Sequence, residues 1–251
     1  MGIPSETKEK LSELARKFEV AEFTGGDPSQ FIRWYAAPSD AEPACFIAAM
    51  LSFGSRKQFI PKIRQIFGMA DLSGGMRSWL VSGKFSDDFR SPDGNSSAKF
   101  YRFYSYSDMN SLFVSLRRIL VSGGTMGGYF RRIYREGDFL PDVICAEFAG
   151  CPLVPHGKDC ANKRVNMFLR WMVRRNSPVD AGFWDWYPQR LLVIPLDVHV
   201  MQEAQKLGLV PPRASAGRKT ALSLTEKLRE IWPDDPCRGD FALFGAGVAE
   251  K

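Results

Sequence analysis

Apolar residues recur along most of this chain at intervals of three and four positions, which is the pattern of amphipathic α-helices. Alternating runs of β-branched residues, which would indicate strands, are few. The pattern therefore predicts an all-α protein. The expected helices are Ser5–Phe18, Ala41–Phe53, Lys57–Phe67, Leu72–Val81, Tyr106–Val121, Leu140–Ala149, Cys160–Arg175, Val198–Leu207, Thr220–Ile231 and Cys237–Gly247.

Two passages interrupt the helical pattern. The segment Ser91–Ser97 (SPDGNSS) combines residues that break both helix and strand, so we expect an irregular surface insertion. Four glycines cluster between residues 123 and 128, around Thr125 and Met126. We interpret that cluster as a helix C-cap followed by a linker, and the alternative is a flexible backbone that approaches phosphate closely.

Composition adds limits on the class of protein. With 251 residues, of which 45% are hydrophobic, the chain is long enough for a substantial core. No apolar run reaches the roughly 18 to 20 residues of a membrane-spanning helix. The start, MGIPSETKEKLSEL, lacks the hydrophobic centre of a signal peptide. The sequence therefore predicts a cytoplasmic protein without a membrane segment.

The five cysteines are scattered and form no Cys-x-x-Cys pair, so we expect reduced thiols. Three of them lie near a histidine, but their spacings match no usual zinc pattern, and neither a metal nor a cofactor is expected. The residues of that group are Cys145, Cys151, His156 and Cys160. The net charge of +6 favours an acidic partner such as nucleic acid, although solubility alone also accounts for it.

The segment from Cys160 to Arg175 combines a core-facing stripe with a basic side. Val165, Phe168, Leu169 and Met172 repeat at helical spacing and predict burial. On the opposite side, Lys163, Arg170 and Arg174 fall within one narrow sector at 100° per residue. The simplest interpretation of that sector is a solvated basic face. The alternative is that Lys163 opens onto a functional cleft.

Asp197 stands between the apolar segment Ile194–Leu196 and a helical pattern that Gly208 ends. This arrangement is typical of an N-capped helix with a glycine stop. Asp197 could therefore do no more than cap its own helix. A carboxylate can also cap with one oxygen and present the other to a cleft, where it would face an amine.

Several motifs resemble those of known proteins. The segment PLDVHVMQEAQKLGL is similar to the Val-Asp-x-His-Val…Leu-Gly-Leu element of the helix-hairpin-helix DNA glycosylase superfamily, and Pro43–Phe59 resembles an early helix of the same superfamily. A closer resemblance, over nearly the whole chain, is to the bacterial DUF2400 family. Its motifs appear here as Lys163–Met172, Pro195–His199 and Asp240–Gly245.

The glycosylase resemblance implies a fold and a domain organisation. Residues 1–251 would form a single all-α unit with two helical lobes and a cleft between them. The lobes would be a helical barrel of residues 41–179 and a second lobe of residues 1–40 and 180–251. The usual Leu-Pro-Gly-x-Gly hairpin is replaced by residues 154–158, VPHGK. The interval from lysine to aspartate is most similar to that of the archaeal 8-oxoguanine glycosylases.

The same resemblance implies a function. Lys163 would attack the sugar C1′ of a damaged nucleotide, with an oxidised purine as a possible lesion, and Asp197 would stabilise the developing positive charge. The partner would be double-stranded DNA that contains a damaged base, bound by a monomer. The resemblance leaves open whether an AP-lyase step then cuts the strand. The C-terminus lacks the four closely spaced cysteines of the iron–sulfur glycosylases, so no cluster is expected.

The remaining site residues are assigned to base and phosphate binding. A flipped base is held by aromatic faces. The aromatic residues available near the pair are Trp171, Phe183, Trp184 and Trp186. Core packing is the alternative for each of them. The expected phosphate contacts are Gly157, Lys158, Arg164 and Arg170. Two other classes remain open, a non-catalytic nucleic-acid-binding module and an unrelated helical interaction protein.

Overall fold

The computed structural model describes residues 2–249, and it is mostly helical, as the periodicity predicts. Contacts divide the chain into two compact units, one of residues 1–25 with 156–251 and one of residues 26–155. The two lobes expected from the sequence are defined by a cleft between them and not by contacts within each unit. This division into units therefore does not test the lobes, and they stay a prediction. Of the helices within residues 2–249, none is long and apolar enough to cross a membrane.

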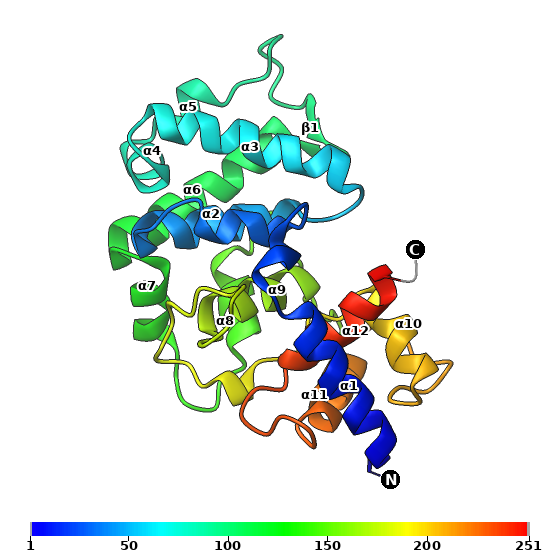
Figure 1. The fold of residues 1–251 in the computed structure, drawn as a ribbon. Coiled ribbons are helices and arrows are strands. Elements are labelled where there is room, and N and C mark those ends of the chain that lie inside the picture. Colours follow the sequence, from blue (N-terminus) through cyan, green and yellow to red (C-terminus); the bar gives the residue numbers. More distant parts are fainter. Residues whose placement is uncertain (1, 250–251) are drawn as a thin grey trace. The chain divides into compact units, whose positions relative to one another are not determined.

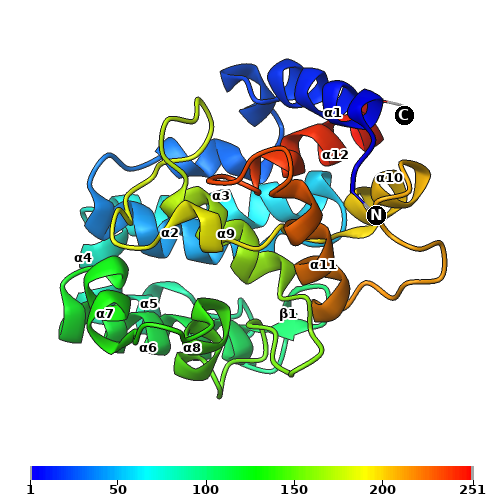
Figure 2. The ribbon, with the colours of Figure 1, turned by 90° about the horizontal axis from the view of Figure 1, so that it is seen from below.

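The first unit combines the beginning of the chain with its last third. Its elements are α1 (Ser5–Phe18), η1 (Ala21–Thr24), α9 (Lys163–Val173), η3 (Gln189–Leu191), α10 (Val198–Lys206), α11 (Arg218–Leu228) and α12 (Arg238–Ala249). Helices α1 and α12 lie side by side, and α12 also packs on α10 (Figures 1 and 2). Small residues allow the close approach of α12 to α1, because Gly245 lies directly against the ring of Phe18.

The second unit is built around a helix that is buried on all sides. Its elements are η2 (Pro28–Arg33), α2 (Pro38–Leu51), α3 (Arg56–Leu72), α4 (Met76–Ser82), α5 (Phe85–Asp88), β1 (Lys99–Tyr101), β2 (Tyr104–Ser105), α6 (Tyr106–Gly123), α7 (Met126–Ile133) and α8 (Leu140–Glu147). In α2 every residue from Ala41 to Leu51 is buried, which is the expected fate of a helix that is apolar all round.

Several elements of the second unit differ from the prediction, since η2, α5, α7 and the two strands were not expected. The glycine-rich passage does contain a left-handed residue, Gly124, after α6, but α7 begins at Met126 where we expected a linker. Thr125 makes this possible because its hydroxyl accepts from the backbone N–H of Gly128. A short antiparallel hairpin, β1–β2, also follows the surface insertion of residues 91–97. Its strands are too short to show alternation in the sequence.

Candidate functional site

Helix α9 buries the stripe that its sequence predicts. Val165, Phe168, Leu169 and Met172 are all buried. The helix begins at Lys163, directly after Asn162, whose φ of 48° places it in the left-handed region. The loop of residues 181–184 is hydrogen-bonded to the other end of α9, because the carbonyls of Trp171 and Met172 accept from its backbone. Both ends of α9 are therefore fixed within the first unit.

Lys163 and Asp197 lie together. The Nζ of Lys163 is 3.8 Å from Oδ2 of Asp197, and the two side chains are 29% and 20% exposed. The other carboxylate oxygen, Oδ1, accepts from the backbone N–H of Val200 at 2.9 Å and caps α10. The Nζ of Lys163 also lies 3.7 Å from the sulfur of Met167. The aspartate thus caps its helix with one oxygen and faces the amine with the other.

A third acidic residue, Asp240, belongs to the same group of charges. It lies in the first turn of α12 and is buried, with its Oδ2 accepting from Nη1 of Arg170. Burial and the negative charge of Asp197 raise the pKa of Asp240 to about 6, against the lowering effect of Arg170 and Lys163. The charge on Asp240 is therefore coupled to both members of the Lys163–Asp197 pair.

Arg170 and Arg174 do not form the solvated basic face that helical spacing suggested. Both are buried, so the surface on which the phosphate contact of Arg170 was predicted is not open to solvent in this structure. Arg170 pairs with Asp180 at 3.3 Å and with Asp240. The sector of α9 that carries these arginines is covered by protein, and only its first residue, Lys163, stays partly open to solvent.

The arginines belong to a larger network of seven charged side chains, most of them buried, with Asp235 and Arg238 partly exposed at its edge. Arg174 pairs with Asp180 at 2.6 Å, with Asp235 at 2.7 Å and with Glu19 at 2.6 Å. Glu19 in turn pairs with Arg238 at 2.9 Å. Three arginines thus face four carboxylates, which are Glu19, Asp180, Asp235 and Asp240. Burial also raises the pKa of Asp180. This excess of acid over base is consistent with a carboxyl group that holds its proton to higher pH.

Sequence reasoning gave none of these four carboxylates a role. Asp240 begins the DFALFG motif, and the signal that could have singled it out is its place in the first turn of a helix that is apolar from there on. A helix of this composition is mostly buried, so its carboxylate is expected to be buried as well. A buried carboxylate requires a cationic partner. Asp180, Asp235 and Glu19 lie in loops or at helix ends and carry no comparable signal.

The predicted base-pocket aromatics divide into buried and partly exposed rings. Trp171 and Trp184 are almost completely buried, and Trp184 contacts Phe168 at 5.4 Å between ring centroids. Trp186 stacks on Trp184 at 5.6 Å with an interplanar angle of 25°. Trp186 and Phe183 are only half-buried. Trp171 and Trp184 therefore serve as core residues here, whereas Trp186 and Phe183 offer surface to a ligand.

The predicted phosphate-binding turn is an exposed loop that leads into α9. Gly157 and Lys158 are exposed, and Gly157 has a φ of 118°, a conformation that favours glycine. The carbonyl of Asp159 accepts from the backbone N–H of Arg218 at 2.9 Å, which ties the loop to the start of α11. Arg164 is half-buried in the first turn of α9. Gly157 and Lys158 thus lie on an exposed loop that precedes α9, whereas Arg170 is buried.

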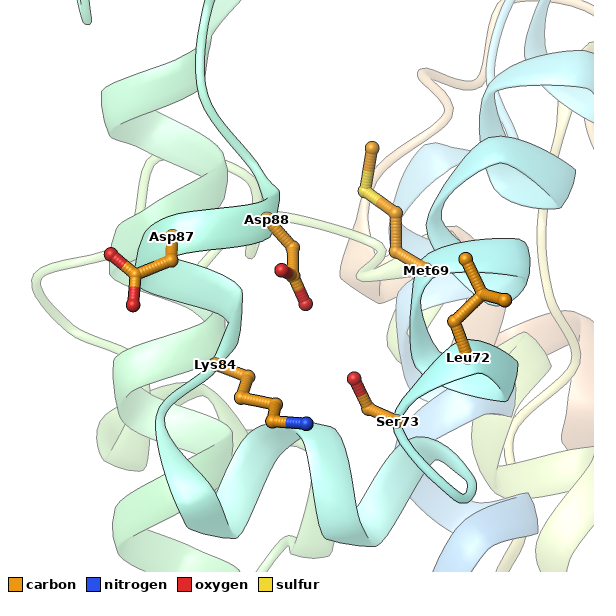
Figure 3. Close-up of a pocket in the computed structure, with 6 residues that line it drawn as sticks. All are labelled: Met69, Leu72, Ser73, Lys84, Asp87 and Asp88. Carbon is orange, nitrogen blue, oxygen red and sulfur yellow. The ribbon is translucent and has the colours of Figure 1, made fainter.

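Other possible sites contain none of these residues. Residues 2–249 include no group of three histidine, cysteine or acidic side chains placed to hold a metal ion, and the five cysteines are free thiols. The second unit has a pocket of about 440 Å³ between the end of α3 and α5 (Figure 3). Lys84 and Asp88 point into it, whereas Asp87 turns away (Figure 3). Asp88 is already engaged by the indole N–H of Trp79 at 2.9 Å.

Comparison with known proteins identifies a family and goes no further. No curated protein and no solved structure shows significant similarity to this chain. A family model described as a protein of unknown function, DUF2400, matches residues 27–249, which includes the whole of α9, α10 and α12. The match covers most of the sequence, and the chain therefore belongs to the DUF2400 family.

Proposed function

We propose that this protein is a DNA glycosylase of the helix-hairpin-helix type, in which Lys163 is the nucleophile and Asp197 its electrostatic partner. The observation that carries the proposal is the 3.8 Å separation between the lysine amine and the carboxylate oxygen that the helix cap leaves available. A nucleophile beside an oriented partner group is the common arrangement of covalent catalysis. The two residues come from the starts of two helices, which fixes their backbones.

The chemistry requires a neutral lysine amine. Its lone pair forms a bond to the sugar C1′, the glycosidic bond breaks, and its electron pair leaves with the base, which takes up a proton. The attached nitrogen then loses a proton, and its lone pair forms a double bond to C1′ as the C1′–O4′ bond opens. The electron pair of that bond stays on O4′, which takes up a proton, and a protonated imine is left between Lys163 and the sugar. Hydrolysis of the imine releases the lysine, and β-elimination from it would cut the strand. Asp197 would stabilise the positive charge that develops at C1′.

We further propose an oxidised purine as the damaged base. Support comes from the position of Lys163 at the first residue of its helix, which resembles the archaeal 8-oxoguanine glycosylases. A base flipped from the duplex requires an aromatic surface to hold it. Trp186 and Phe183, which are half-buried, would provide that surface, with Trp184 behind Trp186 as a rigid support.

Duplex DNA would be bound through its phosphates by the loop before α9. Gly157 and Lys158 are exposed, and Lys158 lies five residues before Lys163. A phosphate bound by this loop would place the DNA strand near the start of the helix that carries Lys163. Arg164 in the first turn of α9 would add a cation. This loop would replace the usual hairpin, and the two-lobed glycosylase layout and action as a monomer belong to the same proposal.

A non-catalytic DNA-binding module is the second candidate function. The observation in its favour is the same ion pair, because the carboxylate that faces the Lys163 amine at 3.8 Å also caps α10, and such a contact between α9 and α10 can be structural alone. In the module, Lys163 would hold these helices together without forming a bond to DNA. Covalent reaction with DNA therefore distinguishes the enzyme from the module.

Reductive trapping with borohydride tests the enzyme directly. Borohydride reduces the imine and converts it into a stable protein–DNA adduct, which gel electrophoresis resolves. With duplexes that carry 8-oxoguanine, we expect an adduct for the wild-type protein and none for Lys163→Ala. Lys10→Ala is the matched control, since it removes an exposed lysine of α1, in the same unit, that has no part in the proposed site, and it should still give an adduct.

The two candidate functions give different outcomes. DNA binding with no adduct on 8-oxoguanine or on abasic duplexes would contradict the glycosylase and support the binding module. An adduct that persists in Lys163→Ala would show that another amine reacts and would remove Lys163 from the mechanism. Affinity that is weak and independent of salt would contradict both functions, because binding to phosphates falls steeply as salt rises.

A further inference from the structure

The hairpin of the second unit has an unusual tip. Tyr101 pairs with Tyr104, so the turn consists of only two residues, Arg102 and Phe103. Arg102 has a φ of 52°, in the left-handed region that glycine adopts readily and other residues rarely do. Tight hairpin turns usually place Gly, Asn or Asp at such a position. An arginine here is a strained choice, and strain of this kind points to a function for the side chain.

Phe103 exposes a large ring beside that arginine. Its side chain is 59% exposed, although it is an aromatic residue in an otherwise well-packed unit. The ring is held in place from below, because Phe53 contacts Tyr101, Phe103 and Tyr104 at centroid distances of 5.0, 5.3 and 5.4 Å. Its own neighbour Tyr104 lies at 4.5 Å. Phe103 thus presents one rigid face without depending on a flexible loop.

Cationic side chains lie near the hairpin and contact its backbone or the rings next to Phe103. Lys99 donates from Nζ to the carbonyl of Phe103 at 2.8 Å, and the guanidinium of Arg102 lies 5.8 Å from the ring of Phe53. Lys62 lies over the ring of Phe100 at 4.6 Å. The two segments that meet here, residues 52–64 and 98–107, contain no aspartate or glutamate, and the next residue, Asp108, directs its carboxylate to the backbone N–H of Ser105. The hairpin tip is therefore a positively charged surface with one aromatic face at its centre.

We propose that the hairpin tip binds a DNA strand, with an unstacked base on the face of Phe103 and flanking phosphates on Lys99 and Arg102. Aromatic platforms within a basic surface are the common means of binding single-stranded nucleic acid. A lipid surface is a poorer fit, since membrane-bound elements present several large apolar side chains and this tip presents one exposed ring. The inference takes DNA as the polymer from the proposed function but requires no chemistry at Lys163.

Fluorescence anisotropy with a labelled single-stranded DNA oligonucleotide tests the proposal. Phe103→Ala should weaken binding about 5- to 150-fold, the range for loss of one base-stacking contact. Phe103→Trp should keep the affinity for the oligonucleotide near that of the wild type, because an aromatic ring face remains. Leu72→Ala is the matched control: Leu72 is 91% exposed in the same unit and should leave affinity unchanged.

Arg102→Gly separates a binding role from a structural one. Glycine relieves the left-handed strain, so the thermal midpoint should stay the same or rise, while DNA affinity falls and the slope of log Kd against log salt decreases by about 0.7. Arg131→Ala removes an exposed cation from α7 and should have a smaller effect on affinity.

Three outcomes would overturn this inference. The first is an affinity of Phe103→Ala for the oligonucleotide that equals that of the wild type. The second is an equal loss of affinity in Arg102→Gly and Arg131→Ala. The third is binding of the protein to anionic vesicles without any binding to DNA. Failure of the glycosylase is a separate result, because Lys163→Ala should bind the oligonucleotide as the wild type does. A missing adduct together with weaker binding in Phe103→Ala would reject the enzyme and leave the DNA contact intact.

Discussion

Arg170 of α9 and Asp240 of α12 form a buried ion pair in which the guanidinium donates to a carboxylate oxygen. The same arginine stacks over the ring of Phe241 at 4.4 Å. The pair connects the helix that begins with Lys163 to the helix that packs on α10, whose cap is Asp197. A buried ion pair contributes little net stability, but the loss of one partner is costly. Its effect is therefore to fix the positions and charges around the Lys163–Asp197 pair.

The titration of Asp240 should be visible in the stability of the protein. Its folded-state pKa of about 6 lies above the ordinary value of 3.8, so the folded state favours the protonated form. The stability that this preference contributes is complete below about pH 3.8 and is lost as the pH rises through 6. Relative to Asp240→Asn, the wild type should lose on the order of 2–3 kcal/mol between pH 4 and pH 6.5.

Urea denaturation of the wild type and Asp240→Asn at several pH values between 4 and 7.5 measures this difference. Asparagine has a similar shape and does not titrate, so other groups cancel when the two free energies of unfolding are subtracted. A difference that does not change with pH would show that Asp240 stays ionised throughout the range.

Removal of Arg170 should be strongly destabilising. Arg170→Met would leave Asp180 and Asp240 buried with less positive charge, and the loss of one partner from a buried pair costs about 3–5 kcal/mol. Arg175→Ala is the matched control, because Arg175 lies on the same chain segment but is exposed, and the change should be within about 0.5 kcal/mol. Urea midpoints with an unchanged m-value provide the measurement.

A second substitution tests the cause of that loss. In Arg170→Met combined with Asp240→Asn, one of the two stranded charges is absent, so part of the stability should return. The changes in free energy of unfolding of the two single variants could instead add up to that of the double variant. That result would mean that Arg170 stabilises α9 through its aliphatic packing and not through Asp240.

Local signals in the sequence located most of the helices. The predicted bounds Ser5–Phe18 are those of α1, and Asp197 was identified as a cap from its place between an apolar segment and a helical pattern. These features depend on residues within one or two turns of each other. The hairpin β1–β2 escaped prediction because its strands, Lys99–Tyr101 and Tyr104–Ser105, are too short to establish a period of two.

Long-range partners could not be predicted in the same way. Helical spacing correctly grouped Lys163, Arg170 and Arg174 on one side of α9, but it could not show that this side is covered. The carboxylates that cover it come from segments up to 155 residues away, as for Glu19 and Arg174. The proximity of Lys163 to Asp197 was predicted from a family resemblance alone, because no periodicity relates residues on two separate helices.

Two glycines within helices should respond in opposite directions to alanine. Gly68 lies inside α3 with open space where a Cβ would be, so Gly68→Ala should stabilise the protein by about 0.5–1 kcal/mol. Gly245 lies inside α12, where a Cβ would clash with the Phe18 ring, and Gly245→Ala should destabilise the protein by about 1–3 kcal/mol. Thermal or urea unfolding distinguishes them. A stabilising Gly245→Ala would mean that α1 moves away from α12 at little cost.

Substitutions of Asp197 separate its cap from its charge. Asparagine caps helices about as well as aspartate, so the free energy of unfolding of Asp197→Asn should be within about 0.5 kcal/mol of the wild-type value. The variant nevertheless loses the negative charge beside Lys163. Asp197→Ala removes both and should cost about 1 kcal/mol.

If Asp197 stabilises charge at C1′, both variants should give much less borohydride-trapped adduct than the wild type, in spite of their different stabilities. Trapping should therefore follow the charge, and urea denaturation should follow the cap. An adduct yield that is normal in Asp197→Asn and reduced only in Asp197→Ala would assign to Asp197 a structural role alone, because only the cap would then matter for the position of α10.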